Sequence, residues 1–389
     1  MFEYFEGNYP WNLATLMTLN NGGLITEVDD VLRPLKAIAA NADNAANEKF
    51  CLAWRTAAQK VEKTAQLDEQ NGNFRAAAGK YARAANYYFA AERQTSIHDP
   101  DRERLYRAFL AAFGKFVTLG RENCERVEIP YENGTTLPAL YVRGKGDAAK
   151  KPCMVHFDGL DVNKEFIYIG GMAEELAERG ISTLIVDHPG VGEALRFRGM
   201  KSIVETERPA SACVDWLIKR DDIDPARIGM MALSLGGYYA PRAAAFEPRF
   251  ACCVAWGAMY DVGIGVRKRL AGGGGQKSVH HFFEHIQWVM GLDSMEEVQV
   301  RADKMTLNGI LDRIRCPFLI VHGENDRQVP VEFARRTYEE AVNSADRQLR
   351  IHTVEEGGSE HCSVDNRELT VSYMAHWIGR TLKAPKELA

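Results

Sequence analysis

The sequence predicts an α/β protein, a doubly wound and mostly parallel sheet that follows an all-helical N-terminal region. From about residue 150 onward, apolar strand-like runs alternate with helical segments, which is the pattern of a parallel sheet covered on both faces. Residues 1 to about 118 show only helical periodicity. The 389 residues suffice for one large α/β domain and an accessory domain. We therefore expect domains at residues 1–120 and 121–389, with a lid-like helical insertion at 263–312.

The helical region divides into a short first helix and a long helical pair. Residues 13–19 carry a helical stripe that ends at an Asn-Asn-Gly-Gly run. Residues 48–70 and 74–93 form two long helical patterns on either side of an Asn-Gly-Asn turn, so we expect them to pair as a helical hairpin. A further helix is predicted at residues 102–116.

An antiparallel hairpin is predicted to lead into the sheet. Residues 126–131 and 137–142 are strand-like and flank Asn133 and Gly134, a dipeptide typical of tight hairpin turns. Apolar runs predict the remaining strands at residues 153–157, 182–186, 228–233, 251–256, 317–322 and 349–353. Helical patterns lie at residues 166–179, 210–219 and 370–382.

Charge and motif content exclude several classes of partner. The net charge is −5 with both signs dispersed along the chain, which disfavours nucleic acid and anionic membranes as partners. His281 and His285 match an inverted zinc-binding motif, H-x-x-E-H, but no clear third ligand follows them. We therefore expect neither a metal site nor another cofactor.

Cysteine usage and the N-terminus bear on the compartment. The eight cysteines are irregularly spaced and form no C-x-x-C pair, so we expect reduced thiols in a cytoplasmic protein. The first residues lack the basic and apolar regions of a signal peptide. No run of about 18 apolar residues predicts a membrane span.

Ser234 stands at the bend between an apolar run and a helix-compatible segment. Residues 228–233 are largely apolar, and Gly236 and Gly237 follow the serine. A serine at a sharp strand-to-helix turn presents its Oγ above the sheet, which is the geometry of the G-x-S-x-G nucleophile motif. Ala232 replaces the first glycine here, and alanine is the smallest substitute that keeps strand and helix close. An ordinary strand followed by a glycine-containing turn is the alternative interpretation.

Two later loops offer the partners that a serine nucleophile needs. A serine hydroxyl becomes reactive when a base takes its proton and a third group orients that base. Asp326 follows the strand at 317–322, and His361 lies in a Gly-rich loop after the last strand, so both belong at the carboxyl edge of the sheet. The chain order serine, acid, histidine then predicts a catalytic triad. Glu324, in the same loop as Asp326, is the alternative acid.

An oxyanion intermediate requires two N–H donors beside the nucleophile. The residue after the serine, Leu235, is expected to supply one of them. The loop after the strand at 153–157 is expected to supply the other. Within this loop, residues 158–161, we favour the N–H of Leu160, with Gly159 giving the loop its shape.

Four stretches together resemble one branch of the α/β-hydrolases. They are residues 157–165, residues 187–193, the A-x-S-x-G-G elbow and the helical region. Over nearly its whole length the chain is similar to the C–C-bond hydrolases of the 2,6-dihydroxypseudooxynicotine hydrolase type and to fungal polyketide-shortening hydrolases. The resemblance implies a helical cap domain and a further catalytic carboxylate at Asp161, where the family has glutamate. Asp158 stands where the family has glycine.

The resemblance implies hydrolysis of a C–C bond next to a ketone in a small aromatic or polyketide-like substrate, through an acyl-enzyme. Hydrolysis of a carboxylic ester or thioester by the same residues is the main alternative, and a non-catalytic ligand-binding receptor is a third. Asp161 is also compatible with a simple ion pair to Lys164. The many aromatic residues of the N-terminus are expected to pack in the cap domain or against a second copy in a homodimer.

Candidate substrate-binding residues come from three places in the chain. Two follow a strand end, one lies in a loop that borders the active site in the family, and two lie in the lid-like insertion. In that order they are Trp256 and Tyr260, Glu193, and Phe283 and Trp288. For Glu193, a carboxylate at the start of a helix is the alternative interpretation.

Overall fold

The computed structural model describes residues 2–273 and 275–384. Its chain divides into two compact units, a helical unit and a unit that contains the strands, called the sheet unit. The helical unit comprises Met1–Cys124 and Lys277–His285, and the sheet unit comprises Glu125–Gln276 and Ile286–Ala389.

The segment Lys277–His285 groups with the helices rather than with the sheet. The sequence analysis kept the whole insertion, residues 263–312, in the second domain. In the structure Ser96 donates a hydrogen bond to Glu284 across 3.0 Å. Because such polar contacts join residues far apart in the sequence, the periodicity of the chain could not assign the segment Lys277–His285 to the helical unit.

The helical unit is built around buried aromatic side chains from the start of the chain. Its elements are α1 (Tyr9–Asn20), α2 (Ile25–Leu32), the 3₁₀ segment η1 (Arg33–Asn41), α3 (Asn44–Gln70), α4 (Phe74–Gln94) and α5 (Asp101–Gly120). The helices α3 and α4 form the predicted helical hairpin. Trp11 stacks on Phe50 with ring centroids 4.4 Å apart, and both side chains are fully buried. The indole N–H of Trp11 donates to Asn47 (3.1 Å), so burial leaves this polar group satisfied.

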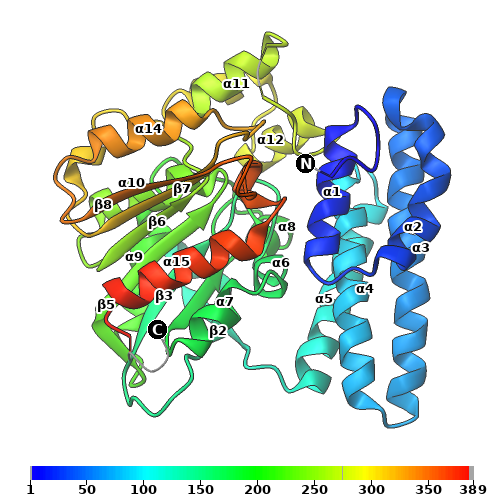
Figure 1. Cartoon of the computed structure of the whole chain (residues 1–389), viewed down its shortest axis with the longest axis horizontal. Helices are drawn as coiled ribbons and strands as arrows, with labels where there is room; N and C mark the ends of the chain where they lie inside the picture. The colour runs from blue at the N-terminus through cyan, green and yellow to red at the C-terminus, as the bar shows by residue number, and fades with distance from the viewer. Residues whose placement is uncertain (1, 274, 385–389) are drawn as a thin grey trace. The chain divides into compact units, whose positions relative to one another are not determined.

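One eight-stranded sheet forms the centre of the sheet unit (Figure 1). Its strands are β1 (Glu125–Pro130), β2 (Thr136–Val142), β3 (Lys151–Phe157), β4 (Ser182–Val186), β5 (Ile223–Leu233), β6 (Cys252–Trp256), β7 (Phe318–Gly323) and β8 (Arg347–His352). The spatial order is β1-β2-β4-β3-β5-β6-β7-β8. The predicted hairpin supplies the antiparallel strands β1 and β2, and every pair from β4 to β8 is parallel.

Helices cover both faces of this sheet, as a doubly wound fold requires. They are α6 (Lys164–Ile169), α7 (Met172–Glu178), α8 (Gly192–Arg196), α9 (Glu207–Leu217), α10 (Gly236–Phe246), α11 (Val262–Leu270), α12 (Phe282–Met290), α13 (Met295–Ala302), α14 (Val331–Glu340) and α15 (Arg367–Thr381), with the 3₁₀ segments η2 (Glu132–Gly134), η3 (Leu311–Arg313) and η4 (His361–Ser363). The first four residues of α12 belong to the helical unit. In Figure 1, α7 and α15 lie in front of the sheet, and α9 and α10 lie behind it.

The single helix predicted at residues 166–179 is wrong in one respect. The structure has two short helices there, α6 and α7, separated by Gly170 and Gly171. Gly171 has a φ of +85°, a conformation that a continuing α-helix cannot contain. The apolar periodicity runs across the break because both helices pack on the same sheet.

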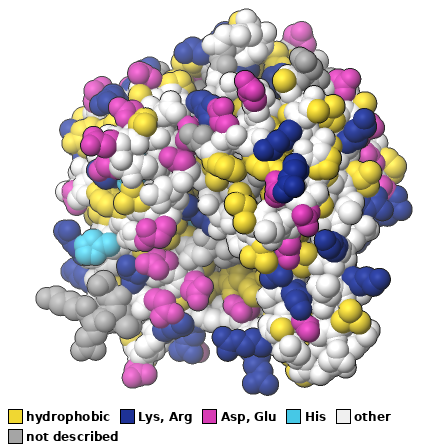
Figure 2. Space-filling view, turned by 45° about the vertical axis from the view of Figure 1, so that its right-hand side comes forward, with side chains coloured by type: hydrophobic (Ala, Val, Ile, Leu, Met, Phe, Trp, Pro, Cys, Tyr) yellow, Lys and Arg dark blue, Asp and Glu magenta, His cyan; other side chains and the backbone are white. Residues whose placement is uncertain are grey.

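Surface and thiol chemistry match the composition. Figure 2 shows basic and acidic side chains interspersed over the visible face rather than gathered into separate fields. All eight cysteines lie within the described residues as free thiols, and Cys153, Cys213, Cys252 and Cys253 are buried. Among the helices that the structure describes, none has both the length and the apolar character needed to cross a bilayer.

Candidate active site

Ser234 occupies a tight elbow between β5 and α10. Its φ is +61°, in the left-handed region that costs energy for any residue with a side chain. The Ser234 N–H donates to the carbonyl of Trp256 at the end of β6 (2.8 Å), which ties the elbow to the neighbouring strand. A Cβ on Gly236 would lie 2.5 Å from the Ala232 Cβ, so the glycine after the nucleophile accommodates the alanine before it.

The elbow places the Ser234 hydroxyl against two later loops. Its Oγ lies 2.7 Å from Nε2 of His361, in the segment η4. The Nδ1 of His361 lies 2.8 Å from Oδ2 of Asp326, in the loop after β7. An ionised carboxylate can only accept hydrogen bonds, so Nδ1 carries a proton and Nε2 is free to accept the serine proton. The three residues expected to form a triad are therefore brought together in the expected connectivity.

Charge couples Asp326 and His361. The fully buried Asp326 side chain accepts hydrogen bonds from the N–H groups of Gln328 (2.8 Å) and Val329 (2.9 Å). Burial opposes its ionisation, but His361 outweighs burial and the pKa of Asp326 is lowered. Burial likewise disfavours a charged His361, yet the Asp326 carboxylate raises the pKa of this imidazole well above its ordinary value. The pair is arranged to hold a proton taken from a hydroxyl.

A second buried imidazole, His322, contacts the acid loop. Its Nδ1 accepts from the N–H of Ala258 (3.1 Å), and its Nε2 lies 3.0 Å from the Val329 carbonyl and 3.6 Å from Asp326. Because Nδ1 accepts, the ring is neutral with its proton on Nε2, and burial lowers its pKa. The sequence analysis missed this role. The sequence did carry a signal for it, because His322 is the last residue of the predicted strand at 317–322 and lies four residues before Asp326.

The backbone around His361 is strained. Cys362 and Ser363 have φ values of 48° and 55°, two consecutive left-handed residues without a glycine. Ser363 Oγ accepts a hydrogen bond from Thr370 (2.7 Å), which ties the turn to α15. The Cys362 thiol lies 3.7 Å from Nε2 of His361. The spacing of the cysteines in the sequence did not indicate that one of them lies beside the triad histidine.

Two backbone segments approach Ser234 from the side where an oxyanion would form. Leu235 is the N-cap residue of α10, and the first amides of a helix have no acceptor within it. From the other direction the loop after β3 presses Gly159 against the nucleophile, since a Cβ on Gly159 would lie 2.9 Å from the Ser234 Cβ. Leu160 and Asp161 follow in this loop, each partly buried.

Replacing Gly159 with alanine is expected to lower the free energy of unfolding by about 1–3 kcal/mol, because the added methyl overpacks a site bounded by the main chain. The Cβ of the new alanine would also lie 3.1 Å from the carbonyl oxygen of Leu233. Urea unfolding measures the change. The matched control is Gly79→Ala in α4, where nothing lies within 4 Å of the added Cβ, and there the substitution is expected to be neutral or stabilising. Equal effects of the two substitutions would contradict the close approach at Gly159.

Two of the candidate substrate-binding residues are committed elsewhere. The Trp256 side chain is 5% exposed and belongs to a core cluster with Met374 and Trp377 of α15, so only its carbonyl serves the site. The Tyr260 hydroxyl donates to Glu340 of α14 (2.8 Å). Both predictions of substrate contact are contradicted. Position after a strand end does not fix which face of the sheet a side chain takes.

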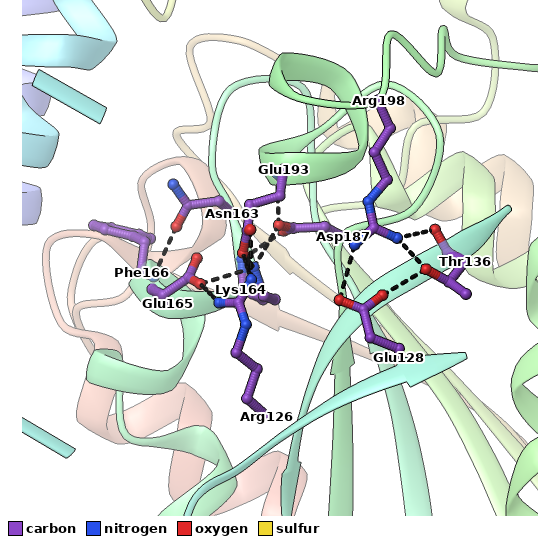
Figure 3. Close-up of polar contacts among 10 residues, drawn as sticks. All are labelled: Arg126, Glu128, Thr136, Asn163, Lys164, Glu165, Phe166, Asp187, Glu193 and Arg198. Carbon is purple, nitrogen blue, oxygen red and sulfur yellow. Dashed lines mark hydrogen bonds and ion pairs between the residues drawn. The ribbon is translucent and has the colours of Figure 1, made fainter. Parts of the chain in front are cut away.

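Glu193 is also engaged by protein groups. Its carboxylate pairs with Lys164 and with Arg126, and its side chain is 8% exposed (Figure 3). This agrees with the alternative interpretation, a carboxylate in the first turn of α8. The prediction that Glu193 lines the pocket is wrong in this structure.

The two candidates from the insertion fall in different units. Phe283 belongs to the helical unit, where the Lys277 ammonium lies 4.4 Å from its ring centroid. Trp288 belongs to the sheet unit, and Arg196 and Lys201 lie over its ring. Both side chains are partly buried. Their contact with a substrate stays a prediction.

The remaining candidates have plain structural contacts. Glu324 is exposed and accepts a hydrogen bond from the N–H of Val354 (3.1 Å), which removes it as the alternative acid. In the H-x-x-E-H segment, His281 pairs with Glu284, and His285 Nδ1 lies 3.3 Å from Arg102. Within the described part of the chain, no group of three or more His, Cys, Asp or Glu residues is placed to hold a metal ion.

Comparison with known proteins agrees with this fold. Residues 173–385 match the prolyl oligopeptidase family. Hydrolase acrC of Aspergillus aculeatus is 31% identical over 314 residues, 69% of this chain and 72% of that protein. The 2,6-dihydropseudooxynicotine hydrolase of Paenarthrobacter nicotinovorans is 29% identical over 266 residues, 68% of this chain and 66% of that protein. The crystal structure of 2,6-dihydroxy-pseudo-oxynicotine hydrolase superposes with a TM-score of 0.75 at 24% identity, over 94% of this chain and 95% of that one. The predicted fold class and the resemblance to these hydrolases are confirmed.

Proposed function

Because this chain is a hydrolase of the prolyl oligopeptidase family, with the α/β-hydrolase fold, we propose that Ser234 is its nucleophile, His361 its general base and Asp326 the group that orients His361. The observation that carries the proposal is the continuous line of contacts from Ser234 Oγ to His361 (2.7 Å) and on to Asp326 (2.8 Å). The reaction that we propose is hydrolysis of a C–C bond beside a ketone in a small aromatic or polyketide-like substrate.

The first step is attack by Ser234 on the ketone carbon. His361 takes the hydroxyl proton as the new C–O bond forms, and the negative charge moves to the former carbonyl oxygen. The N–H groups of Leu235 and Leu160 are the proposed donors to this oxygen. The position of Leu235 at the start of α10 supports the first donor, because the helix dipole favours negative charge there.

The second step breaks the C–C bond. The oxyanion re-forms a carbonyl, and the bonding electrons leave with the carbon fragment. The proton that His361 took from Ser234, passed on directly or by way of Asp161, neutralises that carbanion and leaves His361 neutral. A water molecule, deprotonated by His361, then cleaves the acyl-serine ester and releases a carboxylic acid. The net reaction adds one water across the C–C bond and regenerates Ser234. The carbon leaving group requires stabilisation by a neighbouring carbonyl or aromatic ring, which defines the substrate class.

The similarity to 2,6-dihydropseudooxynicotine hydrolase, together with the resemblance of residues 157–165 and 187–193 to C–C-bond hydrolases, supports carbon as the leaving atom. The catalytic role proposed for Asp161 rests on that resemblance.

A substrate comparison tests the proposal. Turnover is measured on p-nitrophenyl esters and on β-diketones and acylphenols, for the wild type and for Asp161→Asn. We expect C–C cleavage to exceed ester hydrolysis and to fall at least tenfold in Asp161→Asn, with the exposed Asp221→Asn as the matched control. Ester turnover that exceeds C–C cleavage, and that Asp161→Asn leaves unchanged, would support the esterase alternative instead.

Three further expectations belong to the same proposal. The helical unit is proposed to act as a cap over the active site, the protein to form a homodimer, and the cytoplasm to be its compartment. The dense aromatic packing at the start of the helical unit supports a stably folded cap. Size-exclusion chromatography with light scattering measures the oligomeric state.

A further inference from the structure

A buried cluster of charged side chains gathers around the first turns of α6 and α8 (Figure 3). Its centre is Lys164, whose side chain is fully buried. The Lys164 ammonium lies 2.7 Å from Glu165 and 2.8 Å from Asp187, and it also pairs with Glu193. Arg126 on β1 completes the cluster from a half-exposed position by pairing with Glu193. These groups come from β1, α6, α8 and the loop after β4, and none of them has a role in the proposed chemistry.

Asp187 makes contacts within this cluster that the other acids do not make. Its Oδ1 accepts a hydrogen bond from the backbone N–H of Lys164 (2.9 Å), and its Oδ2 accepts from the backbone N–H of Glu193 (2.8 Å). Asp187 therefore fixes the main chain at the start of α6 and at the start of α8. A Cβ on Gly192 would lie 2.0 Å from its carboxyl group, so the α8 segment closes directly over it.

The loop between β3 and α6, residues 158–163, is anchored at both of its ends. At the far end Asn163 caps α6 by accepting from the Phe166 N–H (3.0 Å). At the near end Asp158 is fully buried, and a Cβ on Gly236 would lie 2.9 Å from the Asp158 carbonyl. Gly159, which faces Ser234, is thus held between a fixed start and a fixed end.

The charges in the cluster are consistent with this anchoring. Burial, and then the charge of Asp187, raise the pKa of Asp158 well above its ordinary value, so Asp158 keeps its proton. Burial opposes ionisation of Asp187 too, but Lys164 outweighs it and lowers the pKa of Asp187. Burial raises the pKa of Glu165 to about 7.

We propose that Asp187 is a positioning residue that holds the loop 158–163 in place against Ser234, so that its backbone N–H meets the oxyanion. The inference rests on the proposed function and deepens it by assigning the support of the second oxyanion donor. The Asp187 carboxyl group does not touch the substrate, since its side chain is fully buried. A shift of about 1 Å in such a donor is enough to slow the reaction about 100-fold.

The main test is Asp187→Asn in the full chain, assayed on a p-nitrophenyl ester. An asparagine keeps the shape of the side chain but offers one acceptor atom for the two backbone N–H groups. We expect kcat per active site to fall about 100-fold while KM stays within threefold of the wild type, because the oxyanion contact forms only in the transition state. Active sites are counted by stoichiometric labelling of Ser234 with a fluorophosphonate.

The control is Arg126→Gln, which changes the same cluster at its outer edge and leaves the Asp187 hydrogen bonds in place. It is expected to keep kcat per site within threefold. A purely structural role for Asp187 predicts fewer labelled sites with unchanged kcat per site, and that result would overturn the proposal. Glu165, with a pKa of about 7, can ionise to replace the lost charge beside Lys164, so the Asn variant is expected to fold.

A wild type that fluorophosphonate does not label at Ser234 would instead refute the proposed function, so the two failures are distinguishable.

Discussion

Replacing Ser234 with alanine is expected to lower kcat by at least about 10⁴-fold, the size of effect that removal of a triad nucleophile produces in other serine hydrolases. The physical reason is that the substitution removes the hydroxyl that lies 2.7 Å from Nε2 of His361 and that His361 is proposed to deprotonate. Steady-state turnover on an aryl ester, with fluorophosphonate labelling as a second readout, measures the loss. KM is expected to change little, because Ser234 contributes to bond making rather than to ground-state binding.

A matched serine provides the control for this substitution. Ser372 lies on α15, where its hydroxyl donates to the Leu369 carbonyl, and Ser372→Ala is expected to keep kcat within twofold. Turnover in Ser234→Ala within tenfold of the wild type would contradict the assignment of the nucleophile. Labelling that persists in this variant would show that the reactive residue lies elsewhere.

Replacing Asp326 with asparagine is expected to lower kcat by about 10³–10⁴-fold and to move the acid limb of the pH–rate profile to lower pH. His361 acts as a base only when it is neutral, so wild-type activity is expected to rise with pH as His361 loses its proton. The Asp326 carboxylate raises the pKa of His361, which puts this limb above the ordinary imidazole range near 6.5. Without that carboxylate, burial dominates and lowers the pKa of His361. The profile of kcat/KM against pH measures both changes.

Glu324 serves as the control because it is the other carboxylate of the same loop. It is exposed and bonded to Val354, so Glu324→Gln is expected to keep the rate within threefold and the acid limb where it is. A larger loss in Glu324→Gln than in Asp326→Asn would reverse the assignment of the acid. If the acid limb stays at the same pH in Asp326→Asn, the Asp326 carboxylate does not set the pKa of His361. That result would contradict the electrostatic coupling of the pair.

The positions of Ser234, Asp326 and His361 could be predicted from the sequence for one physical reason. Each follows an apolar run, and the carboxyl ends of parallel strands share one edge of a sheet. The order of the strands therefore brings Asp326 to Ser234, about 90 residues earlier in the chain, and His361 to Asp326, about 35 residues earlier. The same reasoning identified the loop with Gly159, whose approach to Ser234 is observed as a distance that leaves no room for a side chain.

Side-chain direction could not be predicted in the same way. Trp256 and Tyr260 follow a strand end as Ser234 does, yet one packs in the core and the other bonds to Glu340. Beyond a strand end the alternation of faces no longer applies, and a single residue of register decides between pocket and core.

Long-range electrostatics were also beyond the sequence. Lys164 and Glu193 look like ordinary surface charges in the chain, and only folding encloses them with Asp187 and Arg126. The burial of a charge depends on which partners arrive from other strands, and no local pattern records that. The segment Lys277–His285 was misplaced for the same reason, because its partners lie far away in the chain.

The two left-handed residues after His361 have a consequence for how this protein can evolve. Cys362 and Ser363 each hold a conformation about 1 kcal/mol or more above what a glycine would need there. Glycine at either position would increase thermostability in the folded turn but would also free the backbone that aims His361 at Ser234. Selection for heat resistance and selection for turnover therefore act in opposite directions on these two positions. Variants recovered under a selection that demands both heat resistance and activity are expected to spare this turn and to accumulate changes in other parts of the chain.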